Sequence, residues 1–340
     1  MNLKDVKNNA REKMKGVCAI CRECNGVWCR GMVPGMGGAG NGSTMQRNYD
    51  KLNEIRVMMK TLHDAKDPNI KFNFLGKVLS SPVIVAPITG LNYNAGGAIS
   101  EEDYIDDIVN GSIECGTIAM IGDGGNPDFY RWGIEAIKKV DGNGIAIIKP
   151  RENSEIIERI RMAEEVGALA VGIDIDGAGL LVMSTMGQPV GPKSVEELKE
   201  LVDSTKLPFI LKGILSVEEA EIAMKAGVAG IIVSNHGGRV LNGTISSIET
   251  LAEISAAVGD KILVIADGGV REGMDIVKFL ALGACCVLVG RPIIWGSIGG
   301  RREGVRLTLE TLKNQLYQSM ILTGACSLKK INTSMICKNK

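Results

Sequence analysis

Eight short apolar runs between residues 81 and 290 constrain the fold of this chain more than any other feature. Each run is hydrophobic throughout instead of alternating with polar residues, a pattern typical of parallel strands buried on both faces. The segments between them have helical periodicity, and several begin at a serine followed by acidic residues, which is the signature of a helix N-cap. The runs are VIVAP (83–87), GTIAMI (116–121), GIAIIK (144–149), LAVGIDI (169–175), PFILKG (208–213), GIIVSN (230–235), ILVIAD (262–267) and CCVLVG (285–290). Eight strand–helix units in series predict an α/β fold, a closed (βα)8 TIM barrel, with an open doubly wound sheet as the alternative.

The rest of the chain is expected to pack around this barrel. We expect residues 1–80 to form an N-terminal extension packed on the barrel, residues 81–340 to form the barrel, and a final helix to lie near 301–323. The chain has no linker long enough to divide it into independent domains.

Charge and hydropathy narrow the class of partner. The 39 Lys and Arg residues balance the 39 Asp and Glu residues, so no net positive field would recruit nucleic acid or an anionic membrane. The sequence has neither a long uncharged apolar span nor the apolar run of a signal peptide at its N-terminus. We therefore expect a cytoplasmic homo-oligomer that acts on a small molecule and binds neither nucleic acid nor membrane.

Polar and glycine residues gather where the predicted strands end, which is the rim that carries the active site in such barrels. The turns after the seventh and eighth strands contain Asp267-Gly268-Gly269-Val270-Arg271 and Gly290-Arg291. Glycines admit a close approach of backbone N–H groups to an anion, and arginines add bidentate contacts. Because phosphate sites in this fold commonly follow strands seven and eight, the two turns together predict a phosphate site.

Two further strand ends carry groups suited to catalysis. Lys212 ends the fifth strand directly after an apolar run, and a cation at this position could stabilise negative charge that develops on a bound group. His236 follows the sixth strand between Asn235 and two glycines, with Arg239 three residues on. It is the obvious general base, because imidazole titrates near neutrality.

These motifs resemble the FMN-dependent 2-hydroxy-acid dehydrogenases and oxidases, a family that includes glycolate oxidase and lactate oxidase. The resemblance covers most of the chain. It is carried by SNHGGRVLNG (234–243), LKG (211–213), ADGGVREGMDIVKFLALGA (266–284), VGRP (289–292), MILTGACSLKKI (320–331) and, more loosely, GGAGNGSTMQRN (37–48).

The resemblance implies FMN as the cofactor and a role for each matching residue. Lys212 would lie near the flavin N1 edge, His236 would be the catalytic base, and Arg239 would bind a substrate carboxylate. The residues expected around the cofactor are Ala86, Pro87, Ile88, Gly122, Lys149, Lys212, Ser234, His236, Arg239, Asp267, Gly268, Gly269, Val270, Arg271, Gly290 and Arg291.

The sequence also departs from the family at the substrate site. The family's second carboxylate-binding arginine is missing from DIDGAGLL (174–181), and Lys149 and Arg151 stand where it places a glutamine and a tyrosine. Gly122 replaces a serine, and VPGMGGAG (33–40) lacks the N-terminal active-site tyrosine. Flavin binding is therefore expected, and efficient use of lactate or glycolate is not.

Four cysteines near the N-terminus form a motif that the resemblance does not explain. Cys18, Cys21, Cys24 and Cys29 have the spacing C-x2-C-x2-C-x4-C. The first three fit a [4Fe–4S] cluster, although the usual ferredoxin pattern has three residues before the last cysteine. Four thiolates would also suit zinc, and four reduced cysteines in a loop are the third alternative. An iron–sulfur cluster would allow electrons to pass singly to an electron-transfer protein.

The sequence as a whole predicts an FMN-dependent oxidoreductase that oxidises a small 2-hydroxy acid or a related compound. Two alternatives stay open: an FMN-dependent isomerase similar to type 2 isopentenyl-diphosphate isomerase, and a non-catalytic flavin redox sensor or electron carrier.

Overall fold

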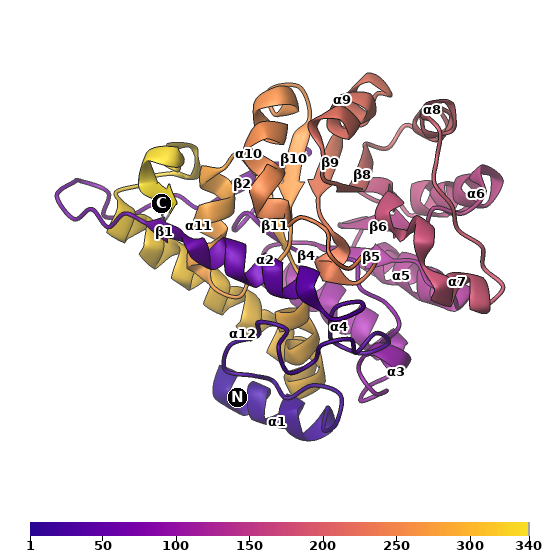
Figure 1. Cartoon of the computed structure of the whole chain (residues 1–340), viewed down its shortest axis with the longest axis horizontal. Helices are drawn as coiled ribbons and strands as arrows, with labels where there is room; N and C mark the ends of the chain where they lie inside the picture. The colour runs from indigo at the N-terminus through magenta and orange to yellow at the C-terminus, as the bar shows by residue number, and fades with distance from the viewer. Residues whose placement is uncertain (339–340) are drawn as a thin grey trace.

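The eight predicted strands form a closed parallel barrel in the computed structural model, which describes residues 1–338 (Figure 1). Their order around the barrel is β10-β11-β4-β5-β6-β7-β8-β9, so neighbours in sequence are neighbours in space and β11 closes against β4. The strands are β4 (Val83–Val85), β5 (Ala119–Gly122), β6 (Gly144–Ile148), β7 (Ala170–Asp174), β8 (Phe209–Ile214), β9 (Gly230–Val233), β10 (Leu263–Ala266) and β11 (Cys286–Val289). The TIM barrel prediction is confirmed, and the open-sheet alternative is wrong.

Most observed strands are shorter than the predicted runs, because the residues at the ends of the runs belong to the loops. GIIVSN, for example, ends as a strand at Val233, and Ser234 and Asn235 enter the loop that carries His236. Apolar character predicts where a strand is buried, whereas hydrogen bonding to the neighbouring strand decides where it ends.

A ring of helices surrounds the barrel, and the predicted N-caps begin three of them. Ser100, Ser194 and Ser216 each accept a hydrogen bond from the backbone N–H three residues on, at 3.0, 3.1 and 3.2 Å. The helices are α3 (Leu91–Asn94), α4 (Glu101–Glu114), α5 (Pro127–Lys139), α6 (Asn153–Glu165), α7 (Leu181–Thr185), α8 (Val195–Asp203), α9 (Val217–Lys225), α10 (Ser247–Val258), α11 (Gly273–Ala281) and α12 (Arg291–Thr323). The predicted final helix is the second part of α12, which breaks at Arg301 where φ is +55°.

The strands divide the hydrophobic core into two layers. Alternate side chains point into the barrel, where Ile84, Met120 and Ile210 pack together, or outward against the helices. The hairpin of β2 (Phe72–Phe74) and β3 (Lys77–Leu79) adds its buried side chains Phe74 and Leu79 to the inner layer. The barrel is therefore a packed core, and a ligand must bind at its rim.

The N-terminal extension packs on two sides of the barrel. Helix α1 (Leu3–Lys13) packs against one end of α12 (Figure 1), so close that a Cβ on Gly299 would lie 2.0 Å from the Val6 carbonyl oxygen. Helix α2 (Ser43–Glu54) contacts the turn that contains His236. The strand β1 (Ile55–Val57) pairs antiparallel with β12 (Ile336–Lys338) near the C-terminus. Among residues 1–338, no helix is both long and apolar enough to cross a membrane.

Candidate active site

A cavity of about 410 Å³ opens where the C-terminal ends of the barrel strands meet the extension. Its volume lies in the range of about 300–1,000 Å³ that is usual for cofactor and substrate sites. The predicted site residues that line it are Ala86, Pro87, Ile88, Lys149, Lys212, His236, Arg239, Asp267, Gly268, Gly269, Val270, Arg271, Gly290 and Arg291. Gly122 and Ser234 are not among the described residues that line it. Ser234 instead supports the site from below, because its Oγ accepts hydrogen bonds from Lys212 Nζ at 3.1 Å and His236 N at 3.0 Å.

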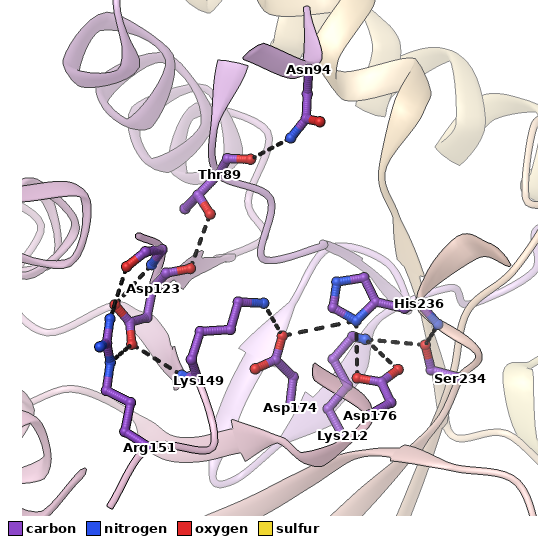
Figure 2. A network of polar contacts seen from close by, with 11 residues as sticks. Thr89, Asn94, Asp123, Lys149, Arg151, Asp174, Asp176, Lys212, Ser234 and His236 are labelled. Carbon is purple, nitrogen blue, oxygen red and sulfur yellow. Dashed lines mark hydrogen bonds and ion pairs between the residues drawn. The ribbon is translucent and has the colours of Figure 1, made fainter. Parts of the chain in front are cut away.

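Five charged or titratable side chains form one network, in which Lys149, Lys212 and His236 line the cavity and Asp174 and Asp176 lie beside them (Figure 2). His236 Nδ1 lies 2.9 Å from Asp176 Oδ1 and 3.9 Å from Asp174 Oδ2. Lys149 Nζ lies 2.5 Å from Asp174 Oδ2, and Lys212 Nζ lies 3.7 Å from Asp176 Oδ2. All five side chains are buried or nearly so. Two ammonium groups thus balance two carboxylates around one imidazole.

The carboxylates and the imidazole also form the one set of three potential metal ligands whose atoms converge among the described residues. A divalent cation there would have to displace both ammonium groups from the carboxylates that they already neutralise. We therefore interpret this set as an ion-pair network that holds His236.

The network fixes the protonation of His236. Burial alone would raise the pKa of Asp176, but the charges of Lys212 and His236 lower it to about 2. Burial lowers the pKa of His236 below its usual 6.5, and the charge of Asp176 offsets this only in part. An ionised carboxylate can only accept a hydrogen bond, so Nδ1 carries the proton. His236 is then neutral at pH 7, with Nε2 free to accept a proton.

The backbone around the histidine is shaped for this contact. His236 has a φ of +57°, which is unusual for a residue with a side chain, and Gly237 and Gly238 continue in the left-handed region. Opposite, a Cβ on Gly213 would lie 2.5 Å from Asp176 Cγ, so the glycine of the LKG motif makes room for the carboxylate. Strain of this kind persists only where surrounding contacts hold it, and it is common in active sites.

Lys212 remains positively charged in this setting. Burial lowers its pKa, but Asp176, Asp267 and Asp174 raise it more, so the pKa lies above the usual 10.5. The cation therefore stays at the end of β8, where a group that becomes anionic on reduction would meet it.

Arg151 does not reach the cavity centre. Its guanidinium is fully buried and binds Asp123 with two nitrogens, Nε at 2.7 Å and Nη2 at 3.0 Å. Asp123 also accepts a hydrogen bond from the Lys149 backbone N–H, and Figure 2 shows this pair to one side of the histidine. Arg151 therefore holds the loop after β6, and it cannot stand in for a missing substrate-binding arginine.

The turns after β10 and β11 have the properties of an anion site. Gly268 and Gly269 have φ values of +106° and +100°, so their backbone needs glycine. Two buried polar atoms, Asp267 Oδ1 and Arg271 Nε, have no hydrogen-bond partner in the structure. Because buried polar atoms are normally paired, these two indicate the place of a polar ligand. Arg271 Nε could donate to an anion such as a phosphate group, whereas Asp267 Oδ1 is an acceptor and needs a donor such as a hydroxyl group.

Arg239 reaches from the β9 loop to the extension. It donates hydrogen bonds to the carbonyl oxygens of Gly35 and Gly37, at 2.5 and 3.0 Å, and to Asn94 Oδ1 at 2.7 Å. Burial and the nearby Arg291 lower its pKa to about 10, so it stays charged at neutral pH. It lines the cavity and, among the described residues, makes no ion pair with a carboxylate, whereas Lys149 and Lys212 are paired with Asp174 and Asp176.

Three residues in or beside the cavity are not apparent from the sequence. Asp176 contacts the histidine, Tyr93 lines the cavity, and Asn94 binds Arg239. The Tyr93 ring lies against Gly90, where a Cβ would come within 2.2 Å of it. Two features of the sequence could have pointed to them: Asp176 is the second acid in the string DIDG, and Tyr93 is an aromatic residue in the segment after the first barrel strand. Neither feature shows which distant residue the side chain contacts.

The cysteine motif lies behind the anion site and outside the cavity lining. Arg271 Nη2 donates to both the carbonyl oxygen and Sγ of Cys24, at 3.3 Å each. Cys18 and Cys29 are buried, and burial with the three neighbouring thiols raises the pKa of Cys18 to about 11. Within residues 1–338, the cysteines are not among the side chains that converge as a set of three or more potential metal ligands.

Comparisons of the sequence and of the structure with known proteins agree on one family. The sequence model described as FMN-dependent dehydrogenase matches residues 35–180 and 181–338. The chain is 33% identical to 2-hydroxyacid oxidase 2 of Bos taurus over 327 residues, which cover 88% of this chain and 91% of that protein. It is 30% identical to L-lactate oxidase of a Nostoc strain, covering 88% and 91% of the two chains. A crystal structure of mandelate oxidase superposes with a TM-score of 0.81 at 28% identity, covering 96% of both chains.

The protonation assigned to His236 can be tested by NMR, because the chain has one other histidine, His63. In protein labelled at histidine, we expect His236 to titrate below pH 6.5. Asp176→Asn should lower this midpoint further, because it removes the charge that favours the imidazolium. His63 serves as the internal reference. A His236 midpoint at or above 6.5, or a rise in the variant, would contradict the assignment.

Proposed function

Because this chain belongs to the FMN-dependent dehydrogenase family, we propose that its cavity oxidises a small 2-hydroxy acid, with the roles that follow for its residues. The family match makes it an FMN-dependent enzyme of the 2-hydroxyacid oxidase type. The observation that supports the residue roles best is the hydrogen bond between Asp176 and His236, because His236 and Arg239 line the same cavity. The isomerase and redox-sensor alternatives gain no support from the family match.

The cavity fits FMN at its phosphate end. Arg271, Gly268 and Gly269 would meet the phosphate with Gly290 and Arg291, and the unpartnered Arg271 Nε could donate to it. The unpartnered Asp267 Oδ1 would accept a hydrogen bond from a hydroxyl group of the same cofactor. Ala86, Pro87 and Ile88 line the same cavity from the end of β4 and would lie beside the ring system. Bound FMN supplies a two-electron acceptor for the carbon that is oxidised.

The residues at the cavity centre would then bind the substrate and move its proton. Arg239 holds the carboxylate, and the neutral His236 accepts a proton at Nε2 as the 2-hydroxy group becomes a 2-oxo group. Asp176 stabilises the imidazolium that results, because its charge lies 2.9 Å from Nδ1. Lys212 offsets the negative charge that reduction adds at the cofactor.

The substrate side chain would lie against an apolar wall. Leu180, Val182 and Met183, which follow β7, line the cavity together with Met36 of the extension. Lys149 is paired with Asp174, so its charge is not free to bind a substrate carboxylate. Because the second carboxylate-binding arginine of the family is also missing, Arg239 would hold the carboxylate alone. We therefore propose a 2-hydroxy monocarboxylic acid whose apolar side chain is larger than the methyl group of lactate.

Two predictions from the sequence stay open beside this function. A metal bound by the four cysteines, either as an iron–sulfur cluster or as zinc, remains a prediction. An electron-transfer protein as partner depends on the iron–sulfur alternative.

The purified protein should be yellow and should release FMN, and not FAD, on denaturation, because the two turns form one phosphate site. The double variant Arg271→Gln/Arg291→Gln should lose most of its flavin, measured as bound FMN per chain. Arg56→Gln/Arg161→Gln is the matched control, since it removes the same charge from two arginines outside the cavity. Full FMN occupancy in the first double variant would show that the phosphate lies elsewhere.

Substrate choice should follow side-chain size. We expect 2-hydroxy-4-methylpentanoate to exceed L-lactate in kcat/KM by roughly 10²-fold, since each buried CH₂ contributes about 0.8 kcal/mol. Lactate itself should be a poor substrate, because part of the hydrogen bonding to its carboxylate is missing. Met183→Ala should reduce the preference. Equal kcat/KM values for the two acids, or efficient turnover of lactate, would refute the assignment of the apolar wall.

A further inference from the structure

The loop between α1 and α2 carries chemistry that the proposed reaction does not use. From Met14 to Gly42 it contains neither helix nor strand, and its four cysteines are free thiols. Irregular loops longer than about 12–15 residues are uncommon in compact domains and usually have a function of their own. The match to the FMN-dependent dehydrogenase family begins at residue 35, after the last of these cysteines. Binding of FMN and substrate therefore does not account for the motif.

This loop wraps the two arginines assigned to the phosphate. Arg271 donates to Cys24, and Arg291 donates to the carbonyl oxygens of Met36 at 2.9 Å and Gly37 at 3.2 Å. Gly37 in turn packs on Cys29, since a Cβ there would lie 1.8 Å from the Cys29 carbonyl oxygen. Both arginines also line the cavity. They thus stand between the thiols on one side and the cofactor site on the other.

We propose that Cys18, Cys21, Cys24 and Cys29 bind a [4Fe–4S] cluster beside the FMN site. Three of the four follow the C-x2-C-x2-C spacing of such clusters. A cluster with four thiolate ligands carries net negative charge, and Arg271 and Arg291 supply positive charge next to it. The burial of Cys18 and Cys29 would shield the iron from solvent on the barrel side.

The cluster's place also gives it a role, which rests on the proposed function. Oxidation of one 2-hydroxy acid to the 2-oxo acid releases two electrons and two protons. A [4Fe–4S] cluster carries one electron at a time, so each turnover would send two electrons outward in succession. Two equivalents of a one-electron carrier would accept them, and the protons would pass to solvent.

The test is metal analysis of the full-length protein purified anaerobically without chelators. We expect about four iron and four acid-labile sulfide per chain, and an electron paramagnetic resonance signal after reduction with dithionite. Cys24→Ser and Cys29→Ser should lose both iron and signal, whereas Cys326→Ser, at an exposed cysteine away from the loop, should keep them. Bound FMN is measured in every sample and should be retained in all three variants.

Each other outcome overturns the proposal. About one zinc per chain would make the site structural, and wild-type protein without metal would leave the cysteines as plain thiols. Iron retained in both loop variants would place the cluster elsewhere. Bleaching of the flavin by a 2-hydroxy acid is followed in the same samples, so that failure of the cluster is distinguished from failure of the proposed function. With the cluster present, ferricyanide should reoxidise the wild type faster than the loop variants.

Discussion

The site depends on one buried contact, the hydrogen bond from His236 Nδ1 to Asp176 at 2.9 Å. A carboxylate taken out of water costs several kcal/mol unless it is paired, and Lys212 supplies the pairing charge. The histidine adopts a left-handed backbone to reach the carboxylate, and Gly213 leaves the space for it. The ends of three consecutive strands, β7, β8 and β9, therefore hold one network of ion pairs. Barrel closure gives these strands their fixed spacing.

The extension completes the site that the barrel begins. Asn48 of α2 and Asn235 exchange two side-chain hydrogen bonds, at 2.8 and 2.7 Å, and the pair is buried. Ala39 N donates to the Gly238 carbonyl oxygen at 2.8 Å, so the extension holds both ends of the histidine turn. Because Gly35 and Gly37 accept from Arg239, the same segment orients the arginine proposed for the substrate. Removing the extension would thus affect catalysis as well as stability.

The sequence predicts the barrel because burial on both strand faces leaves a strong local pattern. It also predicts His236, Lys212 and the phosphate turns, since each directly follows an apolar run. Asp176 could not be assigned, because its partner lies sixty residues away and the contact exists only once β7 and β9 occupy one rim. The role of Arg151 could not be predicted either, because nothing in its neighbourhood predicts the buried ion pair with Asp123.

Proton transfer to His236 is central to the proposed reaction, and anaerobic flavin reduction in a single turnover tests it most directly. With a 2-hydroxy acid that bleaches the wild type, His236→Asn should retain FMN and reduce roughly 10²- to 10⁴-fold more slowly, the usual effect of a positioned general base. Reduction by dithionite should be unchanged, and His63→Asn should behave as wild type. If the substrate reduces His236→Asn as fast as wild type, His236 is not the base and the proposed mechanism is wrong.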